Sequence, residues 1–125
     1  MSTSFDDKKP IFIQIKEVIE DQIINNRLNA HDQIPSTNQL VQFYKINHIT
    51  VSKGIDLLVE EEIIYKKRGV GMFVMEGAKE KLLLQRRNAF AEDFVLPMLK
   101  EAEKLKLSDA AIMKIIEEAK GSEKE

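Results

Sequence analysis

The amino-acid sequence predicts a mainly helical fold with one small β-hairpin and a short helical C-terminal segment. Apolar residues recur at three-to-four spacing through most of the 125 residues, which is typical of amphipathic helices. The exception lies at 63–75, where two β-prone runs flank Gly69-Val70-Gly71. A short glycine-containing loop between such runs is typical of a β-hairpin. The chain length allows one domain of ordinary size, or a small domain with an appendage.

The first helix is expected to begin after Pro10, which tolerates the first helical turn because its missing amide is not needed there. It should end near Asn25-Asn26. Its core-facing stripe consists of Ile11, Ile15, Ile19 and Ile23. We expect residues 1–9 to form a flexible leader. The following connector, 27–33, includes His31, a type that tolerates positive φ, and we interpret this histidine as a loop residue rather than a ligand.

Two short helices are predicted across a tight turn between Ile34 and Lys53. Ser36 is a good N-cap, so the first of them should begin at about Thr37. The segment 45–47 is too short for anything except a turn, and Asn47 is expected to cap the next helix, which covers 48–61. Together the two segments form a helix-turn-helix.

The second of these helices is predicted to have one buried side and one exposed side. Its core stripe comprises Val51, Ile55, Leu58 and Val59, whereas the opposite side carries Ile49, Ser52, Lys53 and Asp56. From Ser36 to Ile55 the sequence contains no Asp or Glu, although acids are common elsewhere. A surface that approaches phosphates would avoid acids, so the exposed, acid-free start of this helix is a candidate nucleic-acid surface. The acids Glu60 to Glu62 end the helix and are expected to face solvent.

The predicted hairpin, 63–75, carries Lys66, Lys67 and Arg68 at its tip. A charge cluster is often only a solvated face. Directly after a helix-turn-helix, however, these cations are placed as the wing of a winged helix, where they can pair with phosphates or reach a minor groove.

The remaining residues, 76–125, predict two or three helices followed by a frayed tail at 121–125. Ser108 is expected to cap the last helix, and Pro97 is expected to kink or break the one before it. Broad apolar faces remain on these helices. They can pack back on the chain's own winged helix or against a second copy, and we favour the second copy. The residues expected at that dimer interface are Phe90, Phe94, Met98, Leu105, Ile112 and Ile116.

The composition argues against several functional classes. The chain has no cysteine, and its two histidines, His31 and His48, lie far apart, so we expect no metal site, no cofactor and no enzymatic activity. No apolar run approaches a membrane span and no secretory signal is evident, which favours the cytoplasm. The net charge of −2 does not exclude nucleic-acid binding, because the local patch matters more than the sum.

Residues 10–75 resemble the winged-helix domain of the GntR family of bacterial transcription regulators. The resemblance is carried by Pro10-Ile11-Phe12, Gln14-Ile15, Asp32-Gln33-Ile34-Pro35-Ser36, Leu40, Thr50-Val51, Leu58 and Gly69-Val70-Gly71-Met72-Phe73-Val74. Within the family, the YtrA-type branch is the most similar at the recognition helix, where this chain has Asn47, Thr50-Val51 and Lys53. That branch dimerises through a short helical tail, 76–120 in this chain, and is often associated with transporter genes.

The resemblance implies a set of DNA-binding residues. Ser36 and Thr50 would hold phosphates, while Asn38, His48, Ser52 and Lys53 would address phosphates and bases. The full expected set is Ser36, Asn38, Asn47, His48, Thr50, Ser52, Lys53, Lys66, Lys67, Arg68, Gly69 and Gly71. The family often has Arg where this chain has Asn38 and His48, and neither residue replaces the bidentate grip of Arg on guanine. The operator sequence should therefore differ from those of relatives.

We accordingly predict a sequence-specific DNA-binding regulator, most simply a repressor, that occupies a palindromic operator as a homodimer. Two recognition helices related by a two-fold axis read an inverted repeat, whereas one alone reads only a few base pairs. The alternative is a winged helix that acts as a protein-interaction module without specific DNA binding. A selection from random oligonucleotides separates the two, because an interaction module would enrich no sequence. The sequence does not identify an effector.

Overall fold

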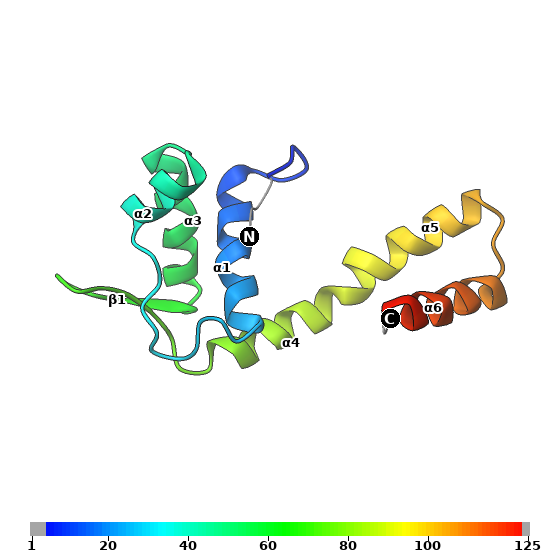
Figure 1. Cartoon of the computed structure of the whole chain (residues 1–125). Helices are drawn as coiled ribbons and strands as arrows, with labels where there is room; N and C mark the ends of the chain where they lie inside the picture. The colour runs from blue at the N-terminus through cyan, green and yellow to red at the C-terminus, as the bar shows by residue number, and fades with distance from the viewer. Residues whose placement is uncertain (1–4, 124–125) are drawn as a thin grey trace. The chain divides into compact units, whose positions relative to one another are not determined.

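The computed structural model describes residues 5–123, and the chain divides into two compact units between Leu84 and Gln85 (Figure 1). The N-terminal unit contains α1 (Ile11–Ile24), α2 (Thr37–Tyr44), α3 (His48–Glu60), β1 (Ile64–Lys67), β2 (Gly71–Val74) and the start of α4 (Ala78–Phe90). The C-terminal unit contains the rest of α4, a π-helical turn η1 (Ala91–Val95), α5 (Leu96–Lys104) and α6 (Asp109–Glu123). The predicted fold class, mainly helical with a two-stranded antiparallel wing, is confirmed.

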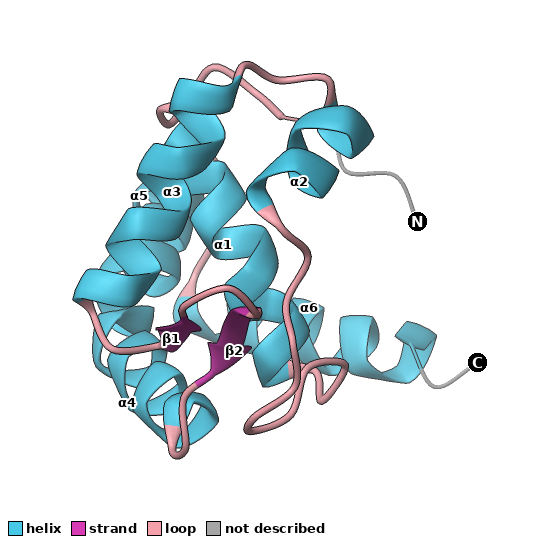
Figure 2. Cartoon of the chain, turned by 90° about the vertical axis from the view of Figure 1, so that its left-hand side faces the viewer, coloured by secondary structure: helices cyan, strands magenta, loops and turns pink. Residues whose placement is uncertain are grey.

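The core of the N-terminal unit is built where α1 and α3 pack against each other (Figure 2). Three isoleucines of α1 face three apolar residues of α3: Ile15, Ile19 and Ile23, with Val51, Ile55 and Leu58, are all at most 2% exposed. Each such side chain stabilises the fold by roughly 1.5–3 kcal/mol relative to an exposed one. Gly54 permits the close approach of the helices, since a Cβ there would lie 2.6 Å from the carbonyl oxygen of Phe12.

The start of α4 belongs to this same core. Ala78 and Leu82 are 2% and 1% exposed and pack in the cluster formed by α1, α3 and the hairpin. The N-terminal unit therefore extends beyond the end of the wing at residue 75 and includes the first turns of α4.

The connector before α2 pairs with the hairpin. The two strands are antiparallel, with Ile64 opposite Val74 and Lys67 opposite Gly71. On the other side of β2, the amide of His31 donates to the Val74 carbonyl at 2.8 Å, and the amide of Ile34 donates to the Met72 carbonyl at 2.9 Å. His31 adopts positive φ, as its residue type allows. Strand β2 of the wing is thus paired on both sides, with β1 and with the connector.

Residues 5–9, which we expected to be flexible, contact the helices. The ring of Phe5 lies 5.3 Å from that of Tyr44 in an edge-on arrangement. The side-chain amide of Gln14 donates to the Asp6 carbonyl at 2.8 Å and its oxygen accepts from the Asp6 amide at 3.1 Å. Residues 1–4 of the expected leader lie outside the described residues.

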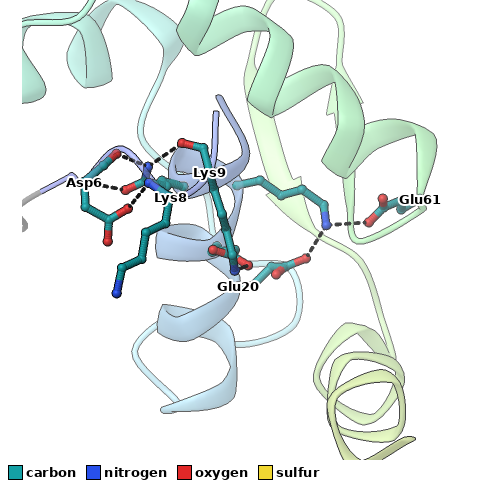
Figure 3. A network of polar contacts seen from close by, with 8 residues as sticks. Asp6, Lys8, Lys9, Glu20 and Glu61 are labelled. Carbon is teal, nitrogen blue, oxygen red and sulfur yellow. Dashed lines mark hydrogen bonds and ion pairs between the residues drawn. The ribbon is translucent and has the colours of Figure 1, made fainter. Parts of the chain in front are cut away.

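A partly buried ion-pair cluster joins α1 to the end of α3. The Nζ of Lys16 lies 3.0 Å from a carboxylate oxygen of Glu20 and 3.1 Å from one of Glu61, and Figure 3 shows these two carboxylates meeting at one ammonium group. Glu20 is only 5% exposed. The prediction that Glu60 to Glu62 all face solvent is therefore wrong for Glu61, which turns toward α1. Glu61 lies at the C-cap of α3, where a negative charge is unfavourable to the helix dipole, and Lys16 offsets that charge.

Pro97 does not break the helical path of the C-terminal unit. The backbone stays right-handed helical through Val95 and Leu96, and the amide of Leu96 donates to the carbonyl of Ala91, five residues earlier. In a regular α-helix the proline ring would clash with the preceding turn. The wider π turn of η1 relieves that clash, so the chain passes from α4 into α5 without leaving helical conformation.

The last helix begins as predicted and ends later. The amide of Ala111 donates to Oγ of Ser108 at 3.1 Å, which confirms the expected cap. We expected fraying from Gly121, but α6 continues to Glu123. Residues 124–125 lie outside the described residues. Within residues 5–123, the helices are all too short or too polar to span a membrane.

Candidate nucleic-acid interface

Local capping fixes the geometry of the α2–turn–α3 segment. Oγ of Ser36 accepts from the Gln39 amide at 3.1 Å, while the Gln39 side chain accepts from the Ser36 amide at 2.8 Å, a complete capping box. Lys45 ends α2 in the left-handed region, with φ of 57°. Oδ1 of Asn47 then accepts from the Thr50 amide at 2.8 Å. The ends of the two helices are therefore defined by contacts between residues three or four apart in sequence.

The exposed side of α3 begins with polar groups that can donate and accept. Nδ1 of His48 lies 3.3 Å from Oγ of Ser52, so two predicted contact residues are joined on one turn of the helix. Lys53, one residue further, places its Nζ 4.5 Å from the centre of the Phe12 ring of α1. This cation–π contact orients the exposed lysine without neutralising it. Asp56 is the first acid after this stretch.

The wing is connected to α3 through a charge pair. Nζ of Lys66 lies 3.7 Å from Oδ1 of Asp56, and both side chains are largely exposed. On the same strand, Lys67 places its Nζ 5.3 Å from the centre of the Phe73 ring. The acid nearest to the recognition surface, Asp56, is therefore turned toward Lys66 of the wing.

Gln33 fixes the tip of the wing. Its Nε2 donates to the carbonyl of Val70 at 3.1 Å. Gly71 has a φ of 145°, which L side chains rarely adopt, and a Cβ there would lie 2.3 Å from that nitrogen, so any other residue would be strained and would displace the Gln33 amide. Gly69 supplies a φ of 77° at the tip itself. The two glycines thus shape the wing by backbone conformation.

Comparison with known proteins decides the family. A solved structure from Bacteroides thetaiotaomicron, assigned to the GntR family of transcriptional regulators, matches with a TM-score of 0.69 and 30% sequence identity. The match covers 90% of this chain and 98% of that one. The chain belongs to the GntR family. Residues 13–74 also match the family described as bacterial regulatory proteins, gntR family.

Other relatives of this chain include a transcriptional repressor and a DNA-binding domain solved in complex with DNA. The transcriptional repressor NagR of Bacillus subtilis is 33% identical over 84 residues, which cover 67% of this chain and 34% of NagR. The chain spans about a third of the length of NagR and of several other curated relatives that it matches. The DNA-binding domain of AraR, solved in complex with operator ORX1, matches with a TM-score of 0.55 and 28% identity over 59% of this chain and 95% of that one.

The GntR fold brings the predicted DNA-binding residues into two groups. The first lies on α2 and α3: Ser36, Asn38, Asn47, His48, Thr50, Ser52 and Lys53, of which Thr50 and Ser52 are half-buried and the others exposed. The second is the wing, with exposed Lys66, Lys67, Arg68 and Gly69 and half-buried Gly71. In Asn47 the amide oxygen is occupied by the cap, so its NH₂ group is the part left to donate to DNA.

Sequence reasoning missed two residues that position this surface, Phe12 and Gln33. Phe12 entered the sequence prediction only within the Pro10-Ile11-Phe12 segment that carries the resemblance, yet its ring lies under the ammonium group of Lys53. Gln33 was interpreted as part of a connector, yet it binds the wing tip 37 residues later. His31, interpreted as a loop residue, does lie in a loop, but its ring nitrogens lie 2.8 Å from the Tyr65 hydroxyl and 2.6 Å from Glu76.

The residues predicted at a dimer interface are mostly exposed in the single chain. Phe90, Phe94 and Leu105 are 56%, 66% and 61% exposed, and the two phenylalanine rings lie 5.7 Å apart. Between α5 and α6 an apolar groove of about 260 Å³ is lined by Met98, Ala102, Leu105, Ile112, Ile115 and Ile116, among others. An apolar surface of this extent on a helical segment is typical of a protein interaction site.

Proposed function

We propose that this GntR-family chain is a sequence-specific DNA-binding transcriptional repressor that binds a palindromic operator as a homodimer. The observation that carries the proposal is the acid-free start of the exposed side of α3, with His48, Ser52 and Lys53, on a helix that Asp56 pairs with the basic wing. The structural match to AraR bound to its operator supports it. Such a regulator acts on the chromosome, so we place it in the bacterial cytoplasm.

In this mechanism α3 enters the major groove and the wing follows the backbone. His48, Ser52 and the NH₂ of Asn47 address base edges or nearby phosphates, and Lys53, held by Phe12, pairs with a phosphate. Ser36 and Asn38 contact the backbone from the start of α2, with Thr50 beside them. Lys66, Lys67 and Arg68 contact phosphates or a minor groove, and Gly69 and Gly71 let the wing backbone approach closely.

In this proposal the C-terminal unit supplies the surface that binds a second copy of the chain. Exposed apolar residues of α4 to α6 would pack against the same residues of a partner chain, as expected for a two-fold interface. We assign the chain to the YtrA-type branch on this basis, together with the start of its recognition helix. Asn38 and His48 stand where relatives often have Arg, so its operator should be its own.

Loss of a positive charge at either group should weaken operator binding. We expect Lys53→Ala and Arg68→Ala each to reduce affinity by about tenfold, because a hydrogen bond to a charged group contributes roughly 1.5 kcal/mol. The dependence of affinity on salt concentration should also become shallower, since a protein that makes one phosphate contact fewer releases fewer counterions when it binds. Gel-shift titrations on a selected operator at two salt concentrations measure both quantities.

Lys120→Ala, a charge removal near the end of α6, serves as the matched control and should leave both quantities unchanged. If neither Lys53→Ala nor Arg68→Ala weakens binding, the site assignment is wrong. If selection from random oligonucleotides enriches no sequence, the proposal of specific DNA binding is wrong. The chain is then a protein-interaction module.

A further inference from the structure

Ile49, in the first turn of α3, exposes an unusually large apolar surface. The residue is 79% exposed, the highest value among the large apolar residues in the part of the chain that the structure describes. It does not belong to the core cluster or to the residues packed against it. As a β-branched residue it also has a lower helix propensity than alanine, so it gives α3 no local advantage. The fold of the single chain therefore does not account for this side chain.

The surroundings of Ile49 are those of the candidate DNA surface. Ser52 and Lys53 follow it at three and four residues, so all three lie on one side of α3. His48 precedes it and contacts Ser52 across the turn at 3.3 Å. The side chain is thus an apolar surface beside hydrogen-bonding groups, at the end of the helix that would face base edges.

We propose that Ile49 determines specificity by packing on the C5 methyl group of a thymine in the major groove of each half-site. The inference rests on the proposed DNA-binding function. In the major groove thymine presents a methyl group, whereas the other three bases present polar groups or a bare C–H at the equivalent place. An isoleucine side chain has no hydrogen-bonding atom, so it gains only from an apolar partner.

The same side chain also disfavours other bases. Packing Ile49 against the amino group of cytosine or adenine would remove water from a donor without replacing its hydrogen bond, which is costly. His48 and Ser52, which flank it, can still hydrogen-bond to the neighbouring O4 of thymine or to N6 and N7 of its adenine partner. Together these residues select a T·A pair.

Deoxyuridine substitution tests this contact because it removes the methyl group and keeps the base pair. We expect replacement of one thymine in one half-site of the selected operator to weaken wild-type binding about fourfold, the equivalent of ~0.8 kcal/mol for one buried methyl-sized group. The same replacement should leave binding by Ile49→Ala unchanged. That variant should bind the thymine operator more weakly than wild type does.

The variants keep the comparison interpretable. Alanine is the better helix former, so Ile49→Ala should fold with an unchanged circular dichroism spectrum. Ile49→Val retains a branched apolar side chain and should keep part of the sensitivity to deoxyuridine. Because wild type and Ile49→Ala are measured on the same two duplexes, any effect of uracil on DNA shape cancels in the cycle.

The outcomes separate the inference from the function on which it rests. Specific binding in which every thymine-to-deoxyuridine change affects wild type and Ile49→Ala equally would overturn the thymine contact and leave the DNA-binding proposal intact. Failure of any DNA sequence to be selected would overturn both.

Discussion

A chain that ends at Leu84 should sediment as a monomer and bind the operator on the order of a hundredfold more weakly than the full chain. Joining two DNA-binding units typically raises affinity by roughly 10²–10⁴, because the second contact becomes intramolecular. Removing residues 85–125 removes the exposed apolar surface that would join two copies, including Phe90, Phe94 and Leu105. Sedimentation velocity gives the oligomeric state, and gel-shift titration gives the affinity.

The end point of the shortened chain is set by the core. Ala78 and Leu82 are buried with α1 and α3, so a chain cut at Met75 would lose part of the hydrophobic core together with the tail. A chain ending at Leu84 retains both residues and should unfold cooperatively. Its thermal unfolding therefore has to be recorded beside its sedimentation, so that loss of pairing is distinguished from loss of fold.

A point variant separates the interface from the length of the chain. Phe94→Asp places a charge on the 66% exposed ring position and should make the full chain monomeric, whereas Asn88→Asp, at an exposed polar position of α4, should not. A dimer of residues 1–84, or a dimer of the Phe94→Asp variant, would remove the C-terminal unit from this role.

The helix-turn-helix could be predicted from sequence because its determinants are local. Ser36 and Asn47 bind amides three residues away, so the beginnings of α2 and α3 can be read directly from residue type. The hairpin is equally local, since Gly69 and Gly71 lie within the turn that they shape. Each of these elements is specified by neighbours in the chain.

The contacts that orient these elements could not be predicted in this way. Gln33 and Val70 are 37 residues apart, and His31 and Glu76 are 45 apart, so their pairing depends on where the core places the connector and the wing. Glu61 follows the same rule, because its partner Lys16 lies on another helix. A pattern of residue types carries no information about such partners.

In the candidate site, too, some features can be predicted from the sequence and others are shown only by the tertiary structure. The absence of acids between Ser36 and Ile55 is the feature from which the sequence alone predicts the candidate surface. The spacing of residues also places Ile49 away from the core, but only the exposed fraction of its side chain shows that nothing covers it. An exposed isoleucine is distinguished from a partly packed one by the tertiary structure.

Lys16→Met should destabilise the N-terminal unit by about 1–3 kcal/mol, because the buried Glu20 carboxylate loses a charged hydrogen-bond partner. The side chain of Glu20 is only 6% exposed, and it loses the ammonium group 3.0 Å away. Replacing both residues, as Lys16→Met with Glu20→Met, should recover much of that loss. Lys104→Met is the matched control, since its pair with Glu101 is exposed and such pairs contribute little. Equal effects of Lys104→Met and Lys16→Met in urea unfolding would contradict the prediction.

The contribution of Lys16 should also depend on pH in a defined direction. Burial alone lowers the pKa of Lys16, but hydrogen bonds and negative charges from Glu20 and Glu61 outweigh it, so its pKa in the folded chain is raised above the ordinary value of 10.5. The folded state therefore holds this proton more tightly than the unfolded state does, and stability falls where only the unfolded state has lost it. The difference in unfolding free energy between wild type and Lys16→Met should be constant from neutral pH up to pH 10.5 and shrink as the pH rises through the folded pKa. A difference that grows with pH over that range would mean that the cluster destabilises the charged lysine.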